Sequence, residues 1–503
     1  EGGEVWDIAA TEKAQAQQDV EMHMLLALLT ASAERGEVSV ETATTSCLRP
    51  MLWSQLHTGS LLEVSSRPER MSMYLSMLSL VKALAAQPEL KAVLAQHVHC
   101  GRSDSSSVVQ AVTAVQRQAE FFTSRARQPS AASEGSSNST AKQTGDEDGR
   151  AMYDLCVHII AVGSLLATPS PPPSQPPAPA ARATTPRTTR SSSSAAAAAT
   201  AAAAAAEAVV GASSASPTFG MSASLSDNLS IGDDSDEGQY IEEMSELQFA
   251  SPASLPGHHY ETKDKEASAP QLSARTKRLA LEAADMMGGA LPASVSSTIW
   301  VRVNESKIHY WRAMISGPES TPYSGGLFIF DIMAPSEYPN VAPKVNLQTT
   351  GGATVRFNPN LYNCGKVCLS LLGTWQGDQG ESWHPKTSTL LQVLMSIQAL
   401  ILVPDPFFNE PGYERVRNTA EGDMQSRSYN ETIREATIRF AMLGHLKSPP
   451  PELKETIIRH FKLRKKTLLA QVREWSTDEK NSTKHASAMR GLLRDLEQAF
   501  AAL

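Results

Sequence analysis

The chain has 503 residues, more than one hydrophobic core usually organises, so two or more modules joined by linkers are expected. Apolar residues make up 41% of the chain and charged residues 19%, which is an ordinary globular composition. The formal net charge of −8 argues against a general nucleic-acid binder and against a polybasic membrane-surface protein. We therefore expect neither nucleic acid nor a membrane as a partner.

The cysteines are few and irregularly placed, at Cys47, Cys100, Cys156, Cys364 and Cys368. Their odd number leaves at least one thiol unpaired, so a reducing compartment is the simpler interpretation and we expect a cytoplasmic protein. The best apolar run, 157–167, is shorter than the stretch of about 18 residues that crosses a bilayer, so no membrane span is predicted. The chain opens with Glu-Gly-Gly and no signal-like segment, which predicts that it is part of a longer polypeptide.

Helix-period apolar spacing recurs in the first third of the chain, at 8–33, 69–96, 105–125 and 150–167. This pattern predicts an α-helical module at 1–167. From 168 to 246 the composition changes to proline, serine and alanine and then to acidic residues, which offer few large side chains to bury. We predict a disordered linker there.

A compact domain is predicted at 271–443. It begins with an amphipathic helix at 275–287, after which the apolar period changes to two. Four strands with short turns between them are expected at 298–303, 308–315, 327–333 and 344–347. Short turns between consecutive strands indicate an antiparallel meander, and apolar stripes at 390–401 and 429–443 predict two later helices. The fold class is therefore α+β, with helices packed on one face of the sheet.

The last segment, 444–503, is predicted to be a helical tail with apolar stripes from Leu453 to Trp475 and from Met489 to Phe500. Basic residues cluster on the first of its helices, at Arg459, Lys462, Arg464, Lys465 and Lys466. We interpret this cluster as a solvated helix face, with a surface for an anionic partner as the alternative.

The candidate chemistry lies in one loop between the last strand and the next helix, Phe-Asn-Pro-Asn-Leu-Tyr-Asn-Cys-Gly-Lys-Val-Cys-Leu-Ser at 357–370. A thiol such as that of Cys368 attacks acyl carbonyls well and also leaves well, so it suits a covalent acyl carrier. The histidines of the domain, His309 and His384, lie in no recognisable protease signature. A carrier that must not hydrolyse its acyl group needs no strong adjacent base, so this setting agrees with a carrier.

Motifs in consistent order over about 170 residues make this domain resemble the ubiquitin-conjugating (E2) family. They are Tyr-Trp-Arg-Ala at 310–313 with Ile-Ser-Gly-Pro at 315–318, Thr-Pro-Tyr-Ser-Gly-Gly at 321–326, Tyr-Pro at 338–339 with Ala-Pro-Lys-Val at 342–345, Asn-Pro-Asn at 358–360, and Gly-Lys-Val-Cys-Leu at 365–369. Each motif alone is weak evidence, but their order within one domain is specific. The resemblance implies the ubiquitin-conjugating (UBC) fold.

By resemblance, the chain is an enzyme in which Cys368 accepts ubiquitin as a thioester from a ubiquitin-activating enzyme (E1) and passes it to a substrate lysine. No cofactor is implied, because the E1 partner consumes the ATP. Asn360 would donate a hydrogen bond to the oxyanion of the transfer step, an effect worth about 3 kcal/mol for one donor elsewhere. Holding the turn is the other role open to this side chain. Asn409 and Glu410 stand where the family keeps a gate that orients and deprotonates the incoming lysine, and a purely structural role is equally open to them.

Three departures from the family pattern narrow the resemblance. Asn358 replaces the usual His, Ser370 stands where many members have Asp, and the loop at 373–384 is long. Together with the helical tail, these features resemble the giant hybrid E2/E3 branch of inhibitors of apoptosis, whose zinc-binding BIR module has no counterpart here. That branch implies hybrid E2/E3 behaviour, an antiparallel homodimer, and substrates that include caspases and other apoptosis regulators. Smaller members with Asn-Pro-Asn are the alternative within the family.

Two functions of other classes are alternatives to this one. A noncatalytic ubiquitin-binding module of the same fold would lack the nucleophile, whereas Cys368 is present. A zinc site would combine Cys364 and Cys368 with His97, His99 and Cys100, and the spacing of its paired thiolates is permitted. Its two halves lie on either side of the predicted linker, which disfavours it, so we expect no metal.

Overall fold

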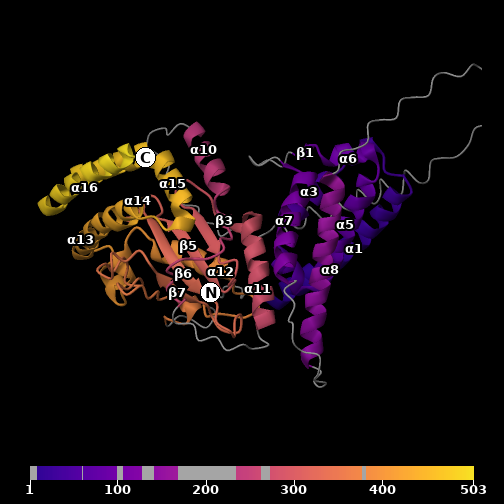
Figure 1. Ribbon diagram of the computed structural model, residues 1–503, viewed down its shortest axis with the longest axis horizontal. Helices are drawn as coiled ribbons and strands as arrows, with labels where there is room; N and C mark the ends of the chain where they lie inside the picture. Colours follow the sequence, from indigo (N-terminus) through magenta and orange to yellow (C-terminus); the bar gives the residue numbers. More distant parts are fainter. Residues whose placement is uncertain are drawn as a thin grey trace, which may run out of the picture. The chain divides into compact units, whose positions relative to one another are not determined.

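The computed structural model describes residues 8–58, 60–98, 106–126, 141–167, 234–261, 272–375 and 381–503. The chain divides into two compact units, 1–226 and 227–503, drawn in Figure 1. The larger part of the predicted linker, 168–233, and the residues 99–105 with His99 and Cys100 lie outside the described residues.

The first unit is helical, as predicted. Its elements are α1 (Ile8–Glu34), α2 (Val40–Thr45), α3 (Leu48–Thr58), α4 (Leu61–Ser66), α5 (Pro68–Ala85), α6 (Pro88–Leu94), β1 (His97–Val98), β2 (Ser106–Ser107), α7 (Val108–Ala126) and α8 (Ala141–Ala167). Helices α5 and α6 begin at Pro68 and Pro88, where a missing N–H costs nothing because the first turn has no internal acceptor. Helix α1 packs along α5 and α7 packs along α8 (Figure 1), so apolar side chains of α5 such as Tyr74 and Leu78 are buried.

One stretch of this unit differs from the prediction that no segment could span a membrane. The α8 segment Gly149–Ala167 is long and apolar enough to do so by length and composition, and 39% of it is buried inside the structure. Its buried residues include Leu155, Ile159 and Val162. Core helices pass the same test, so length and composition alone do not indicate a membrane.

The second unit is built on a sheet of five strands in the order β3 (Phe249–Ala250), β4 (Ile299–Val303), β5 (Tyr310–Ser316), β6 (Leu327–Met333) and β7 (Lys344–Leu347). Strands β4 to β7 form the predicted antiparallel meander, with Trp300 opposite Met314 and Met314 opposite Ile329. Strand β3 pairs with β4 in parallel, and it was not expected. The structure therefore confirms the four predicted strands and adds a short fifth one.

The predicted linker is wrong at its C-terminal end. Residues 234–245 form helix α10 (Asp234–Ser245), whose Tyr240 and Met244 are buried. The Tyr240 hydroxyl lies 2.9 Å from His460 Nδ1, and Glu243 pairs with Arg459 at 2.6 Å. An acidic composition alone suggested solvation, but two large apolar side chains per three turns are enough to anchor a helix when a partner surface is present.

The remaining helices of this unit follow the predicted stripes. They are α11 (Leu272–Asp285), α12 (Leu390–Ser396), α13 (Ala420–Ala436), α14 (Gly444–Lys447), α15 (Lys454–Thr477) and α16 (Thr483–Ala501), with π-helical turns at Met286–Ala290, Ile397–Ile401 and Thr437–Leu443 and 3-10 turns at Ser370–Leu372, Pro406–Asn409, Tyr413–Val416 and Pro451–Leu453. Helix α12 begins at a capping box, in which Thr389 and Gln392 each accept a hydrogen bond from the other's backbone N–H.

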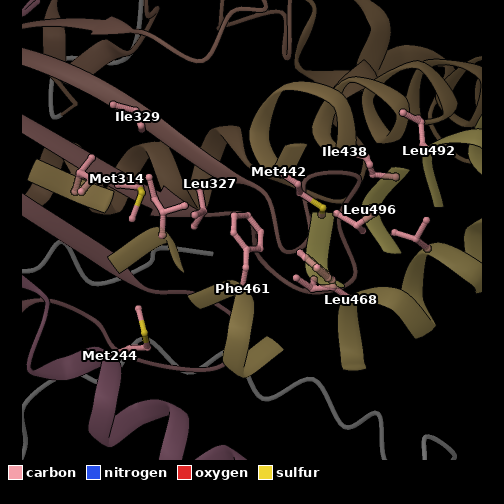
Figure 2. Close-up of a cluster of buried hydrophobic side chains, with 14 of the residues drawn as sticks. Met244, Met314, Leu327, Ile329, Ile438, Met442, Phe461, Leu468, Leu492 and Leu496 are labelled. Atoms are coloured by element: carbon pink, nitrogen blue, oxygen red, sulfur yellow. The ribbon is translucent and has the colours of Figure 1, made fainter. Parts of the chain in front are cut away.

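The C-terminal helices complete the core of the sheet domain. A single cluster joins sheet residues such as Met314, Leu327 and Ile329 to Ile438 and Met442 and to the α15 and α16 residues Phe461, Leu468, Leu492 and Leu496, as Figure 2 shows. Every residue of β4, β5 and β6 is buried, so both faces of the sheet are covered. The prediction of helices on one face is therefore incomplete. The tail predicted at 444–503 is helical, as expected, and its helices belong to the same core.

Most of the basic cluster on α15 is used within the molecule. Arg459 pairs with Glu243, Arg464 pairs with Glu319 at 2.6 Å, and Lys465 Nζ donates to the Phe500 carbonyl at 2.9 Å. The structure therefore supports neither a fully solvated face nor a ready surface for an anionic partner, because three of the five cations are engaged by other elements.

Because His460 of α15 is buried, we expect the folding stability to fall at acid pH. Burial, together with the nearby Arg464, lowers the pKa of His460 to about 3. The folded-state pKa lies below the unfolded value of about 6.5, so protons bind the unfolded chain first and stability is lost as the pH falls below 6.5. We expect this one group to cost about 2 kcal/mol of unfolding free energy between pH 7 and pH 5. Urea unfolding of the wild type and of His460→Gln at both pH values should show a smaller pH dependence in the variant; equal dependence would contradict the prediction.

Candidate active site

The loop that follows β7 is folded back on itself by short backbone bridges. Leu361 bridges Val367, Asn358 bridges Leu361, and Asn346 of β7 bridges Lys366. Gly365 has a φ of +85°, and a Cβ there would come within 2.4 Å of the Leu347 carbonyl. Only glycine fits this left-handed position against the strand, which explains the glycine three residues before Cys368.

The backbone of Cys368 is held by Asn360 from two sides. The Cys368 N–H donates to the Asn360 carbonyl at 2.9 Å, and Asn360 Nδ2 donates to the Cys368 carbonyl at 2.9 Å. Cys368 exposes only 2% of its surface, and Asn360 is partly exposed beside it. The Asn360 amide therefore holds the turn in this state and lies next to the residue predicted to be the nucleophile.

Asn358 organises the start of the loop. Its Nδ2 donates to the Ile401 carbonyl at 2.8 Å, and its Oδ1 accepts from the Asn360 N–H at 2.8 Å. The Tyr323 hydroxyl donates to the neighbouring Phe357 carbonyl at 2.8 Å. Burial raises the pKa of Tyr323 well above its usual range, so the phenol keeps its proton and remains a donor. Asn358 thus ties the loop to the π-helical turn Ile397–Ile401 that follows α12.

The two residues predicted as a gate have different surroundings. Asn409 Nδ2 donates to the Leu400 carbonyl at 3.0 Å and lies 3.5 Å from Asn358 Oδ1, so this amide anchors the segment inward. Glu410 is about one-third exposed, and its Oε2 accepts from Arg356 Nη2 at 3.1 Å. The Glu410 carboxylate is therefore accessible to solvent, whereas the Asn409 amide is held by the protein.

The ends of the long loop at 373–384 are fixed by single side chains. Thr374 Oγ1 accepts from the Leu369 N–H at 3.0 Å and donates to the Val367 carbonyl at 2.8 Å. At the other end Trp383 Nε1 donates to the Pro339 carbonyl at 2.6 Å. Thr374 therefore supports the strand-like segment on both sides of Cys368.

The zinc interpretation finds no support among the described residues. These contain no group of three or more histidine, cysteine, aspartate or glutamate side chains placed to hold a metal ion. Cys364 is exposed, and both it and Cys368 are free thiols. His99 and Cys100 of the zinc alternative lie outside the described residues.

Arg356 was not singled out from the sequence. It precedes the buried Phe357, and alternation of an inward Phe357 with an outward Arg356 is visible in the sequence. No local pattern pairs Arg356 with Glu410, because 54 residues separate them.

The chain is similar to proteins of known family. A family model described as ubiquitin-conjugating enzyme matches residues 283–437. The chain is similar to the dual E2 ubiquitin-conjugating enzyme/E3 ubiquitin-protein ligase BIRC6 of Mus musculus, with 46% identity over 253 residues, covering 48% of this chain and 5% of that protein. It is 43% identical over 259 residues to the probable ubiquitin-conjugating enzyme protein 17 of Caenorhabditis elegans, covering 50% of this chain and 35% of that protein. It is 40% identical over 252 residues to the putative ubiquitin-conjugating enzyme E2 38 of Arabidopsis thaliana, covering 50% of this chain and 73% of that protein.

The chain thus spans 5% of the first relative, 35% of the second and 73% of the third. The aligned stretches are longer than the segment 283–437 matched by the family model.

Proposed function

Because this chain belongs to the ubiquitin-conjugating enzyme family, we propose that it accepts ubiquitin from an E1 as a thioester on Cys368 and transfers it to a substrate lysine. The observation that carries this proposal is the pairing of Cys368 and Asn360 by two hydrogen bonds within the family's loop. No cofactor takes part in the transfer, since ATP is consumed by the E1 partner.

The proposed reaction has two balanced steps. In the first, the Cys368 thiolate attacks the thioester carbonyl on E1, a new thioester forms, and the E1 thiolate leaves. In the second, the ammonium of a substrate lysine gives one proton to Glu410 and the resulting amine attacks the Cys368 thioester to form a tetrahedral oxyanion. The carbonyl then re-forms, the Cys368 thiolate leaves, and the nitrogen gives its second proton to the released thiolate or to water. Because Cys368 exposes only 2% of its surface, the first step requires the side chains around it to move before the E1 thioester reaches its sulfur.

Asn360 and Glu410 supply the two polar functions that the second step needs. The Asn360 amide lies beside Cys368 and donates a hydrogen bond to the Cys368 carbonyl. It stabilises the oxyanion if, during transfer, this hydrogen bond moves from the Cys368 carbonyl to the oxyanion. Glu410 presents a partly exposed carboxylate that accepts a proton from the incoming ammonium. Asn409 holds the Glu410 segment through the Leu400 carbonyl.

Replacing Asn360 by alanine should leave charging by E1 intact and slow discharge to lysine by about 10²-fold, the cost of losing one oxyanion donor. Single-turnover decay of the preformed thioester, followed on non-reducing gels, measures this. Asn363→Ala removes an exposed amide of the same loop and serves as the matched control. If Asn360→Ala also fails to charge and melts at a lower temperature, holding the turn is its whole role.

The wider biological setting forms part of the proposal. Similarity to a relative named as a dual E2/E3 enzyme supports transfer without a separate ligase. The resemblance drawn from the sequence motifs adds caspases and other apoptosis regulators as proposed substrates and a homodimer as the proposed working form. The free thiols of Cys364 and Cys368 support a reducing location such as the cytoplasm. Transfer to caspases in a reaction with E1, ATP and ubiquitin but no added ligase would support this setting, and transfer only with a ligase would contradict it.

A further inference from the structure

One guanidinium joins the turn that carries Asn360 to the candidate gate carboxylate. Arg356 Nη2 donates to the Pro359 carbonyl at 2.6 Å and to Glu410 Oε2 at 3.1 Å. The same guanidinium lies over the Tyr362 ring, with its central carbon 4.6 Å from the ring centroid. Residue 356, just before the loop 357–370, and residues 359 and 362 within it are therefore joined to Glu410, which follows α12 in the chain.

Each part of this arrangement restricts the others. A guanidinium is planar and carries its donors in a fixed fork, so stacking on Tyr362 sets the plane in which Nη2 points. Within the part of the chain that the structure describes, Glu410 Oε2 is the oxygen engaged by Arg356, and Oε1 accepts no hydrogen bond. One oxygen of the carboxylate is thus fixed and the other remains available to an incoming group.

We infer that Arg356 is a positioning residue for lysine transfer, which holds Glu410 against the Asn-Pro-Asn turn so that Oε1 faces the ammonium of the incoming lysine. This inference rests on the proposed function. It adds a residue whose guanidinium contacts Pro359, Tyr362 and Glu410 and which acts through Glu410.

The solvent exposure of the Arg356–Glu410 pair distinguishes a positioning role from a role in folding stability. The Arg356 and Glu410 side chains are 43% and 36% exposed. Exposed ion pairs add little to folding stability because water screens them. Loss of the pair should therefore leave the fold intact while freeing the carboxylate to rotate, and misplacement of a reacting group by about 1 Å lowers rates strongly.

The test compares Arg356→Gln, Glu410→Gln and the double variant in the full chain, with charging and discharge measured separately. E1-dependent charging and the melting temperature should match those of the wild type. The limiting rate of thioester discharge at saturating free lysine should fall on the order of tenfold in Arg356→Gln. The double variant should be no slower than Glu410→Gln, because Arg356 acts through that carboxylate.

Arg417→Gln is the matched control, since its guanidinium lies 4.5 Å over the Phe408 ring beside the same segment. It should discharge at the wild-type rate. A wild-type discharge rate in Arg356→Gln would overturn the inference. So would a double variant whose fold loss in discharge rate equals the product of the two single losses. Equal loss of charging and discharge in Arg356→Gln would also overturn it, because that result marks a general disturbance of the loop. Failure of the wild type to charge at all would instead overturn the proposed function.

Discussion

Replacing Cys368 by alanine is expected to abolish the ubiquitin adduct that forms with E1 and ATP. The proposed carrier function needs one sulfur that bonds to an acyl carbonyl and is later released, and a methyl group can do neither. The expected band appears on a non-reducing gel of the wild type, disappears when thiol is added, and is missing in Cys368→Ala. This is the largest effect that we expect, because no residual transfer can pass through position 368.

Two further variants make this result specific. Cys364→Ala removes the exposed thiol four residues away and should still form the adduct, so it controls for a nonspecific thioester on an accessible cysteine. Cys368→Ser should form a slower adduct that survives thiol, because the hydroxyl gives an oxyester. An adduct that persists in Cys368→Ala, or one that requires Cys364, would contradict the assignment. No adduct in the wild type would favour a noncatalytic ubiquitin-binding module, consistent with the near-complete burial of Cys368.

Replacing Asp331 by alanine should lower the free energy of unfolding by about 3–5 kcal/mol, the cost of leaving a buried partner charge uncompensated. Asp331 of β6 is fully buried and binds Arg312 of β5 through two hydrogen bonds, of 2.6 Å from Nε and 3.0 Å from Nη2. Arg312 Nη1 also pairs with Glu452 at 2.6 Å, and the His259 N–H donates to Asp331 Oδ2 at 2.8 Å. The aspartate therefore connects the sheet to the segment after β3 and, through Arg312, to the start of α15.

Urea unfolding of the full chain, followed by fluorescence of the sheet domain, measures this loss. Glu497→Ala is the matched control, because it removes one partner of the exposed Arg473–Glu497 pair and should cost less than about 1 kcal/mol. A loss below about 1 kcal/mol for Asp331→Ala would mean that Glu452 alone, or water, compensates Arg312.

These two expectations depend on the sequence to different degrees. The prediction of Cys368 as the nucleophile depends on short motifs around it. Each motif consists of neighbouring residues, so it can be read in a single sequence. The Asp331 network could not be identified in that way. Alternation in β5 and β6 places Arg312 and Asp331 on one face of the sheet, but a charged residue on a strand ordinarily predicts a solvent-facing position. Only the arrival of Glu452 and His259 from elsewhere in the chain turns that face into a buried network.

The sequence by itself determined the helical first unit, the four-stranded meander, and the loop that carries Asn360 and Cys368. Each of these is indicated by apolar residues that recur every two or 3.6 positions, or by turn residues and short motifs within a few neighbouring positions. The tertiary structure decided which surfaces those elements cover. Helices α10, α15 and α16 close one face of the sheet, and Arg356 meets Glu410 across 54 residues. An apolar stripe or a charged residue shows that a side chain needs a contact. Which residue makes that contact depends on the packing of the whole chain, because the free energies of burial and of charge pairing depend on the tertiary surroundings.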